Sequence, residues 1–163
     1  MTGLVANPAA PLDPADAEVV ADGWFPPVTL AAVRSAIRLG DGAVTTPRLT
    51  AAIEGAMIHA FRELSDWRSA RALDGAANLQ SVTDLSINGR NYAVALWERI
   101  IRSLAAAELF AGNRDISATD QGLDRAAEKD ESADEYRRTA WAAISDLRSI
   151  GGEDVPRNRV ALL

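Results

Sequence analysis

Few side chains in this sequence of 163 residues could carry out catalysis or bind a metal ion. Cysteine is absent and His59 is the single histidine, which excludes disulfides, a thiol nucleophile, thiolate metal sites and a histidine-rich metal site. His59 has the chemistry of a general base or a ligand, but no carboxylate, serine or cysteine lies at a recognisable spacing from it. We interpret it as a surface or interface histidine, and we expect His59→Ala to leave the biological activity intact.

The acidic side chains form no recognisable cation site either. They are densest between Asp124 and Glu135, but this run lacks the spaced glycine and the final glutamate of a calcium-binding loop. A solvated helix face is the better interpretation. The sequence also has no glycine-rich phosphate loop, Walker motif, GxSxG elbow or HExxH motif. We therefore expect no cofactor, and an enzyme of unknown type is the weakest alternative.

The composition is that of an ordinary soluble globular protein, and the length fits one domain. Apolar residues make up 48% of the chain, charged residues 25%, and the net charge is −6. A negative charge argues against gripping nucleic acid through its phosphates. The longest stretch without a charged residue, 1–12, is too short to span a membrane, and no basic residue precedes Arg34 as one would in a signal peptide. A protein made and used in the cytosol fits these features.

Helix signals extend over most of the chain and predict an all-α fold. We expect a bundle of about four helices with long central helices, an extended N-terminal arm and a C-terminal tail. The helices are expected at 29–39, 46–73, 89–112 and 118–150. Thr29 is placed to cap the first helix and Thr46 the second, with Pro47 at the first helical position. The apolar stripes should meet in one core that contains Ile53, Leu64, Leu96, Ile100, Leu104 and Ile144.

The connector from Asp74 to Asn88 is predicted to be a short strand or an ordered loop. It runs into the turn pair Asn88-Gly89, which favours a change of chain direction. Three residues give it partial hydrophobic patterning: Val82, Leu85 and Ile87. Nothing in the connector indicates a catalytic loop.

Several apolar residues are candidates for contacts with a partner chain. Ile58 points away from the apolar stripe of its helix and indicates a second contact surface. The third helix is apolar nearly all round, through residues such as Trp97 and Ile101, so it is the central core helix or also faces another subunit. Trp24 and Phe25 either pin the preceding segment to the core or anchor a neighbouring chain, as interface aromatics do.

Composition divides the chain into three segments. Residues 1–23 form an acidic arm, rich in proline and alanine, that should be flexible by itself; 24–150 form the helical domain, and 151–163 form a tail. Gly151-Gly152 favours termination of the last helix. The tail carries an apolar run after two arginines, and such a segment gains free energy only by docking. Its candidate contact residues are Arg157, Arg159, Val160, Leu162 and Leu163.

A series of short runs follows an order that is typical of one protein family. These runs are Trp24-Phe25-Pro26, Val33-Arg34, Thr46-Pro47-Arg48-Leu49, Ile87-Asn88-Gly89, Trp97-Glu98-Arg99-Ile100, Ala105 to Arg114-Asp115, Trp141 in the last helix, and Arg159-Val160-Ala161-Leu162-Leu163. Their order resembles the head completion proteins of contractile-tailed bacteriophages. Trp97 replaces the tyrosine that is usual in this family, and Ile100 replaces a small residue, so individual contacts should differ.

The resemblance implies an all-α head–tail connector, with 24–150 as the connector domain and 151–163 as its docking tail. Such proteins form a ring under the portal of the filled head, and portal symmetry implies twelve copies. The ring extends the DNA channel, helps retain the packaged genome and prepares the head for the tail. The implied partners are further copies, the portal and tail or neck proteins, and DNA passes through the lumen without sequence-specific binding. The implied location is the neck of the virion, after synthesis in the host cytoplasm, with no membrane, no catalytic residues and no cofactor.

The residues by themselves leave a different class of function open. A soluble helical protein-interaction or regulatory module unrelated to phage fits the long helices and the acidic surface equally well. A closed ring, by contrast, uses heterologous interfaces and needs two different apolar faces on each subunit. The apolar third helix and Ile58 are the candidates for these two faces.

Overall fold

A computed structural model of the chain describes residues 14, 16–37, 44–112 and 120–152, and of 120–131 it describes the backbone. Four α-helices make up most of the described fold, and the described strands are two pairs of two residues each. The all-α class predicted from the sequence is therefore confirmed. In chain order the elements are β1 (Glu18–Val19), β2 (Val28–Thr29), α1 (Leu30–Ala36), α2 (Thr46–Leu73), a 3-10 turn (Leu79–Val82), β3 (Ser86–Ile87), β4 (Arg90–Asn91), α3 (Tyr92–Ala111) and α4 (Asp120–Arg148).

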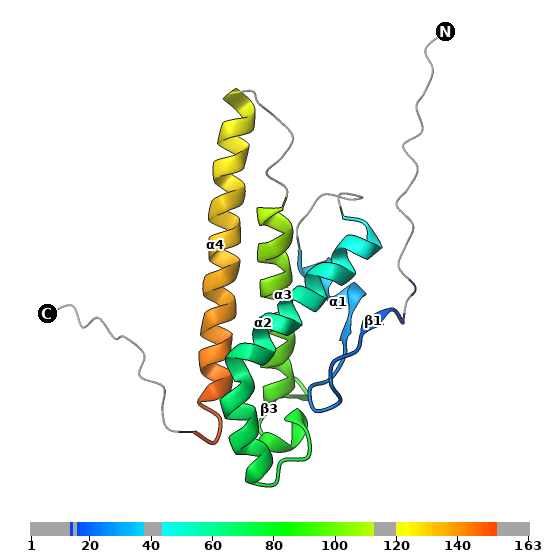
Figure 1. Cartoon of the computed structure of the whole chain (residues 1–163), viewed down its shortest axis with the longest axis vertical. Helices are drawn as coiled ribbons and strands as arrows, with labels where there is room; N and C mark the ends of the chain where they lie inside the picture. The colour runs from blue at the N-terminus through cyan, green and yellow to red at the C-terminus, as the bar shows by residue number, and fades with distance from the viewer. Residues whose placement is uncertain (1–13, 15, 38–43, 113–119, 153–163) are drawn as a thin grey trace, which may run out of the picture.

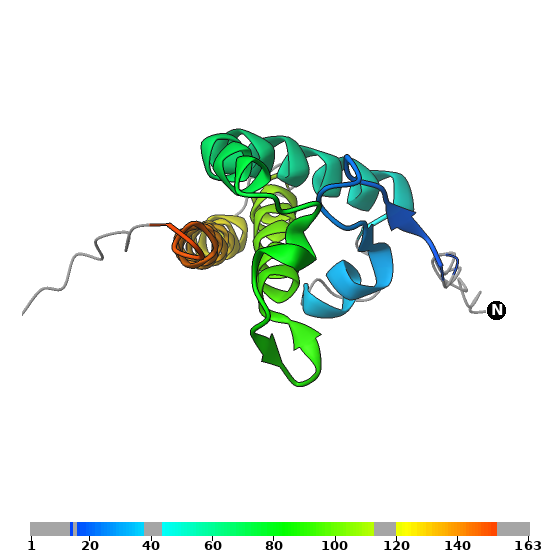
Figure 2. The same cartoon turned by 90° about the horizontal axis from the view of Figure 1, so that it is seen from below.

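Helix α3 lies at the centre of the molecule. Helix α4 runs alongside it, α2 crosses it, and α1 packs on the side away from α4 (Figures 1 and 2). Since the other helices surround α3, its side chains are buried on several faces: Ala93, Leu96, Trp97, Ile100, Ile101, Ala105, Ala106, Ala107 and Leu109. The interpretation of this apolar helix as the central core helix is confirmed.

The first two helices lie close to their predicted positions. The Thr29 hydroxyl accepts a hydrogen bond from the backbone N–H of Ala32 at 3.3 Å, which confirms the predicted cap of α1. Helix α1 ends at Ala36 rather than at residue 39, and residues 38–43 lie outside the described part of the chain. Helix α2 has the predicted bounds, Thr46–Leu73, but its N-cap residue is Thr45 rather than Thr46, and Pro47 takes the second helical position.

The segment before Trp24 is not a separate arm up to residue 23. Strand β1 pairs antiparallel with β2, with Glu18 opposite Thr29 and Val19 opposite Val28. Val19 is buried, and Asp22 forms an ion pair with Arg68 of α2 at 2.5 Å. The predicted boundary at 23/24 therefore lies inside a folded ribbon, because backbone pairing and a distant ion pair hold residues that look flexible in the sequence. Residues 1–13 and 15 lie outside the described part of the chain.

A β-hairpin occupies the residues at which the third helix was expected to begin. Strand β3 pairs with β4, and Asn88 and Gly89 both have positive φ, 50° and 72°, as the central residues of a type I′ turn require. Helix α3 then starts at Tyr92, where the Asn91 side chain caps it by accepting a hydrogen bond from the Val94 N–H. The predicted short strand and turn pair are confirmed, and the helix starts three residues later than predicted.

The hydrophobic core contains five of the six predicted residues, namely Ile53, Leu64, Leu96, Ile100 and Ile144. The sixth, Leu104, is only half-buried, because α2 and α4 leave a groove beside it. Helix α4 ends at Arg148, and the following turn is held by α2: the Trp67 indole N–H donates to the Ile150 carbonyl at 3.0 Å, and the Arg71 guanidinium donates to the Gly151 carbonyl.

Candidate assembly interface

Four of the predicted contact residues form a single intramolecular cluster around the centre of the fold. Trp97 is fully buried, and its ring stacks on that of Phe25 with centroids 4.3 Å apart. Its indole N–H donates to the Pro26 carbonyl at 3.0 Å. Ile101 is fully buried one turn further along α3, and Trp24 is 9% exposed.

This burial selects between the two interpretations of the aromatic residues. Trp24 and Phe25 pin the N-terminal ribbon to the core, since the Trp24 indole N–H also donates to the Ala76 carbonyl at 3.2 Å. Trp24, Phe25, Trp97 and Ile101 have no free face for a neighbouring chain in this fold. We correct their assignment: they are core residues, and they are not retained as partner contacts.

Ile58, in contrast, lies on the surface of α2 with 70% of its side chain exposed. The next residue, His59, points toward α4, where its ring meets the edge of Trp141 at 5.5 Å between centroids. Trp141 is 46% exposed. The sequence placed Trp141 in the last helix, among the runs that carry the family resemblance, but its exposure was not predicted.

His59 is half-buried between α2 and α4. Its Nδ1 lies 3.3 Å from the Arg62 guanidinium, one turn along the same helix. Within the described part of the chain, no three His, Asp or Glu side chains are grouped so as to hold a metal ion. An aromatic ring and a cation therefore lie beside the His59 imidazole. Among the described residues, no nucleophile lies next to it.

A groove lies next to this His59–Trp141 contact. Helices α2 and α4 approach each other toward their C-terminal ends and separate toward their N-terminal ends (Figure 1). The groove in this region has a volume of about 530 Å³, with α3 as its floor. The residues that line it are Gly55, Ala56 and His59 of α2, Leu104, Ala107, Glu108, Ala111 and Gly112 at the end of α3, and Arg137 and Trp141 of α4.

Glu108 is the anionic side chain among the lining residues. Its carboxylate lies against Gly55, where an added Cβ would come within 2.6 Å of Oε2. Among the described residues it makes no hydrogen bond or ion pair, and desolvation raises its pKa above the ordinary glutamate value. Arg137 lies in the same groove, but its guanidinium is paired with Asp134 at 2.6 Å. Glu108 is thus an exposed carboxylate at the groove without a cationic partner among the described residues.

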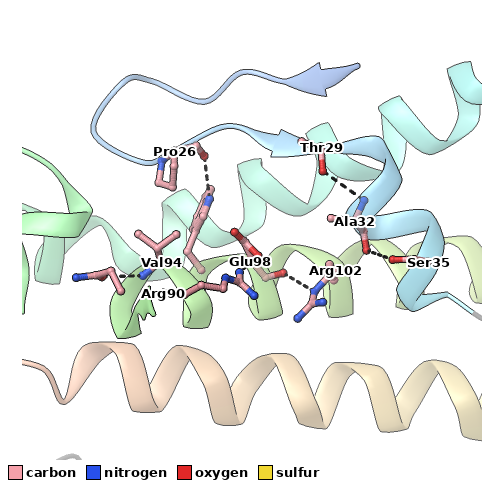
Figure 3. A network of polar contacts seen from close by, with 10 residues as sticks. Pro26, Thr29, Ala32, Ser35, Arg90, Val94, Glu98 and Arg102 are labelled. Carbon is pink, nitrogen blue, oxygen red and sulfur yellow. Dashed lines mark hydrogen bonds and ion pairs between the residues drawn. The ribbon is translucent and has the colours of Figure 1, made fainter. Parts of the chain in front are cut away.

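A second apolar surface lies on the β3–β4 hairpin. The hairpin extends away from the helices on the side opposite α2 (Figure 2). Leu85 is 64% exposed and Ile87 58% exposed. An ion pair between Arg90 of β4 and Glu98 of α3 ties the hairpin to the central helix (Figure 3). The partial hydrophobic patterning of this segment was visible in the sequence, but its exposure was not.

The tail residues Arg157, Arg159, Val160, Leu162 and Leu163 lie outside the described part of the chain, as does most of the predicted tail. The run 124–135, which was predicted to be a solvated helix face, belongs to α4. The side chains of its residues up to 131 also lie outside the described part of the chain. Within the described residues, no helix has the length and apolar character needed to cross a bilayer.

Comparisons with known proteins identify the family. No solved structure matches the chain. Residues 19–158 match the family described as phage head completion protein (GPL). The chain belongs to this family. The head completion/stabilization protein of Escherichia phage P2 is 30% identical to it over 120 residues, which are 73% of this chain and 70% of the P2 protein.

The family match covers almost all of the described fold of this head completion protein. It begins at Val19 in β1 and includes all four helices, the groove and the hairpin. The resemblance inferred from the short sequence runs is therefore confirmed. The family consists of structural proteins of the phage head and is not an enzyme family, so the role to explain is assembly with other head or tail components.

Proposed function

We propose that this head completion protein forms a ring, of twelve copies by portal symmetry, that joins the portal to the tail. In this role it extends the DNA channel and helps to retain the packaged genome. Family membership supports a structural role in the phage head. It also sets aside the alternative of an interaction or regulatory module unrelated to phage.

The proposal of a ring rests on the placement of exposed apolar side chains on two separate faces. We assign Ile58 of α2 and Trp141 of α4, both exposed, to one face, and the exposed Leu85 and Ile87 of the hairpin segment to the other. The hairpin extends on the side opposite α2 (Figure 2). A closed ring needs two different complementary faces on each subunit, and water contact with these side chains is unfavourable unless a neighbour covers them.

The tail 151–163 supplies the contact with the portal in this proposal. Val160, Leu162 and Leu163 would fill an apolar pocket of the portal, while Arg157 and Arg159 would meet its carboxylates. The net charge of −6 suits a lumen that DNA traverses, because a basic channel would hold the phosphates and slow the passage of DNA. The protein would then reside at the neck of the virion after synthesis in the host cytoplasm.

The ring is tested with two surface variants, Ile58→Asp and Ile87→Asp, studied by native mass spectrometry and electron microscopy with and without portal. Each variant should fold normally, as judged by circular dichroism, and should not form rings alone. Mixed together, they should form heterodimers through the one intact pair of faces, and nothing larger. Leu73→Asp changes a side chain that is 89% exposed at the end of α2, outside both faces, and serves as the matched control. Rings formed by either single variant would contradict the proposal.

A further inference from the structure

The groove between α2, α3 and α4 lacks an occupant among the described residues. Its floor is apolar, with Leu104 only half-buried and Trp141 46% exposed at the rim. Glu108 adds a carboxylate that has no cationic partner in the described part of the chain. A segment that fits this groove therefore combines aliphatic side chains with a cation.

The segment 155–163 of the same chain has this chemistry. Arg157 and Arg159 precede the aliphatic residues Val160, Leu162 and Leu163. The chain enters this segment from a fixed point, because the Ile150 and Gly151 carbonyls accept hydrogen bonds from Trp67 and Arg71 of α2. Gly151 has a φ of +64°, which ends the helical path there.

The reach of the segment agrees with the position of Glu108. Arg137, which lines the groove together with Glu108, lies 14 residues before Gly151, about 21 Å back along α4 at 1.5 Å per residue. Arg159 lies seven residues after Gly152, and seven extended residues span about 23–25 Å. Pro156 favours an extended path. A tail that doubles back along α4 thus brings Arg159 to the level of Glu108.

We propose that residues 155–163 dock into the groove of their own subunit, with Arg159 on Glu108 and the aliphatic residues that follow it on the part of the groove lined by Ala107 and Ala111. Occupation by the same copy is favoured because a short linker gives an effective concentration in the millimolar range, well above that of a second subunit at micromolar concentration.

The docked tail acts as a latch on the free subunit. It covers the apolar groove and its own aliphatic residues before assembly, and a partner that binds the tail has to draw it out of the groove first. This inference does not depend on the ring, because it concerns the isolated subunit.

A disulfide trap tests the latch directly, since the natural chain has no cysteine and an engineered pair is therefore unique. The full-length variant Ala111→Cys/Val160→Cys should form an intramolecular disulfide at least tenfold faster than the control variant Leu85→Cys/Val160→Cys. Leu85 is an exposed residue beside the hairpin, outside the groove. Equal rates for the two pairs would overturn the proposal. Circular dichroism verifies that both variants are folded.

Charge reversal tests the pairing of Arg159 with Glu108. Arg159→Glu or Glu108→Arg, added to the Ala111/Val160 cysteine pair, should slow the trap at least fivefold, and the two reversals together should restore it. Failure of the double reversal to restore the rate would overturn the pairing.

Mixing two single-cysteine proteins, Ala111→Cys and Val160→Cys, distinguishes the source of the tail. Disulfide-linked dimers that form as fast as the intramolecular product would assign the tail to a neighbouring copy and overturn the latch. Dimer formation at a small fraction of that rate supports docking within one subunit.

Discussion

At the residue scale, the tryptophans show how the chain divides its aromatic side chains between core and surface. Trp24, Trp67 and Trp97 each bury the ring and satisfy the indole N–H with a backbone carbonyl from a distant segment. These bonds join the N-terminal ribbon, the end of α4 and α3 to their neighbours. Trp141 is 46% exposed and contacts the ring of His59, so it is the tryptophan positioned to meet a partner.

Burial also decides what a truncated aliphatic side chain costs. Ile100 is fully buried in α3, so Ile100→Ala should lower the free energy of unfolding by about 2–5 kcal/mol. Leu104 is half-buried at the groove, so Leu104→Ala should cost less than about 2 kcal/mol, below the range expected for a core position. Urea denaturation of both variants measures the difference. Equal losses would show that the groove beside Leu104 is closed in solution.

Glu108 should make the stability depend on pH. Its pKa is raised in the folded state by desolvation, so between the ordinary value near 4.5 and the raised value the folded chain binds more protons than the unfolded chain. The free energy of unfolding contributed by this group therefore falls as the pH rises through that window. When both chains lack residues 155–163, Glu108→Gln should be more stable than its parent at pH 7, because no Arg159 is then available to pair with Glu108, and the difference should vanish below pH 4. Thermal denaturation of both proteins at each pH measures it, and a constant difference would contradict the prediction.

At the element scale, local hydrogen bonds and turn geometry set where each helix begins. Thr29 and Asn91 cap α1 and α3 through their side chains. The start of α3 is delayed to Tyr92 because the preceding residues pair as a hairpin around Asn88 and Gly89. The hairpin is held to α3 by the ion pair of Arg90 with Glu98, and Glu98 also accepts a hydrogen bond from Arg102 through its backbone carbonyl (Figure 3).

Gly89→Ala tests the turn that presents the second apolar face. The φ of +72° at Gly89 should cost an L-residue about 1–2 kcal/mol, and because the hairpin is a surface element it should open locally. Hydrogen exchange at the amides of Arg90 and Tyr92, which face Ile87 and Leu85 across the hairpin, should therefore accelerate, while the helical circular dichroism stays unchanged. Asn88→Gly is the matched control, since glycine adopts positive φ freely. Unchanged exchange in Gly89→Ala would show that the turn is not constrained as described.

At the scale of the whole molecule, the fold separates a self-sufficient helical body from the segment proposed to engage the portal. The core is built from residues between Val19 and Leu147. The turn after α4 is anchored on α2 through Ile150. None of these contacts requires the residues that follow Gly152, so the body should fold without them.

Deletion of 155–163 should consequently leave a folded, helical protein that docks poorly and yields heads that leak DNA or fail to join tails. Circular dichroism and thermal melting test whether the truncated protein is folded. A portal pull-down and complementation of a defective phage test whether it docks and completes heads. The substitution Leu73→Asp, on a surface outside the tail, is the control for nonspecific loss of activity. A truncated protein that docks and completes heads at the natural level would show that the tail is not the anchor.

The sequence by itself determined the helical class, the four helix positions to within three residues at each end, and the turn at Asn88-Gly89, because periodicity, caps and turn residues are local properties. It also carried the family resemblance. Only the tertiary structure decided which apolar residues are covered. Periodicity places Trp97 on a helix face, but its burial depends on Phe25 and Pro26, about 70 positions away. The pairing of β1 with β2 and the groove beside Glu108 likewise arise from the way distant segments meet, which no local pattern encodes.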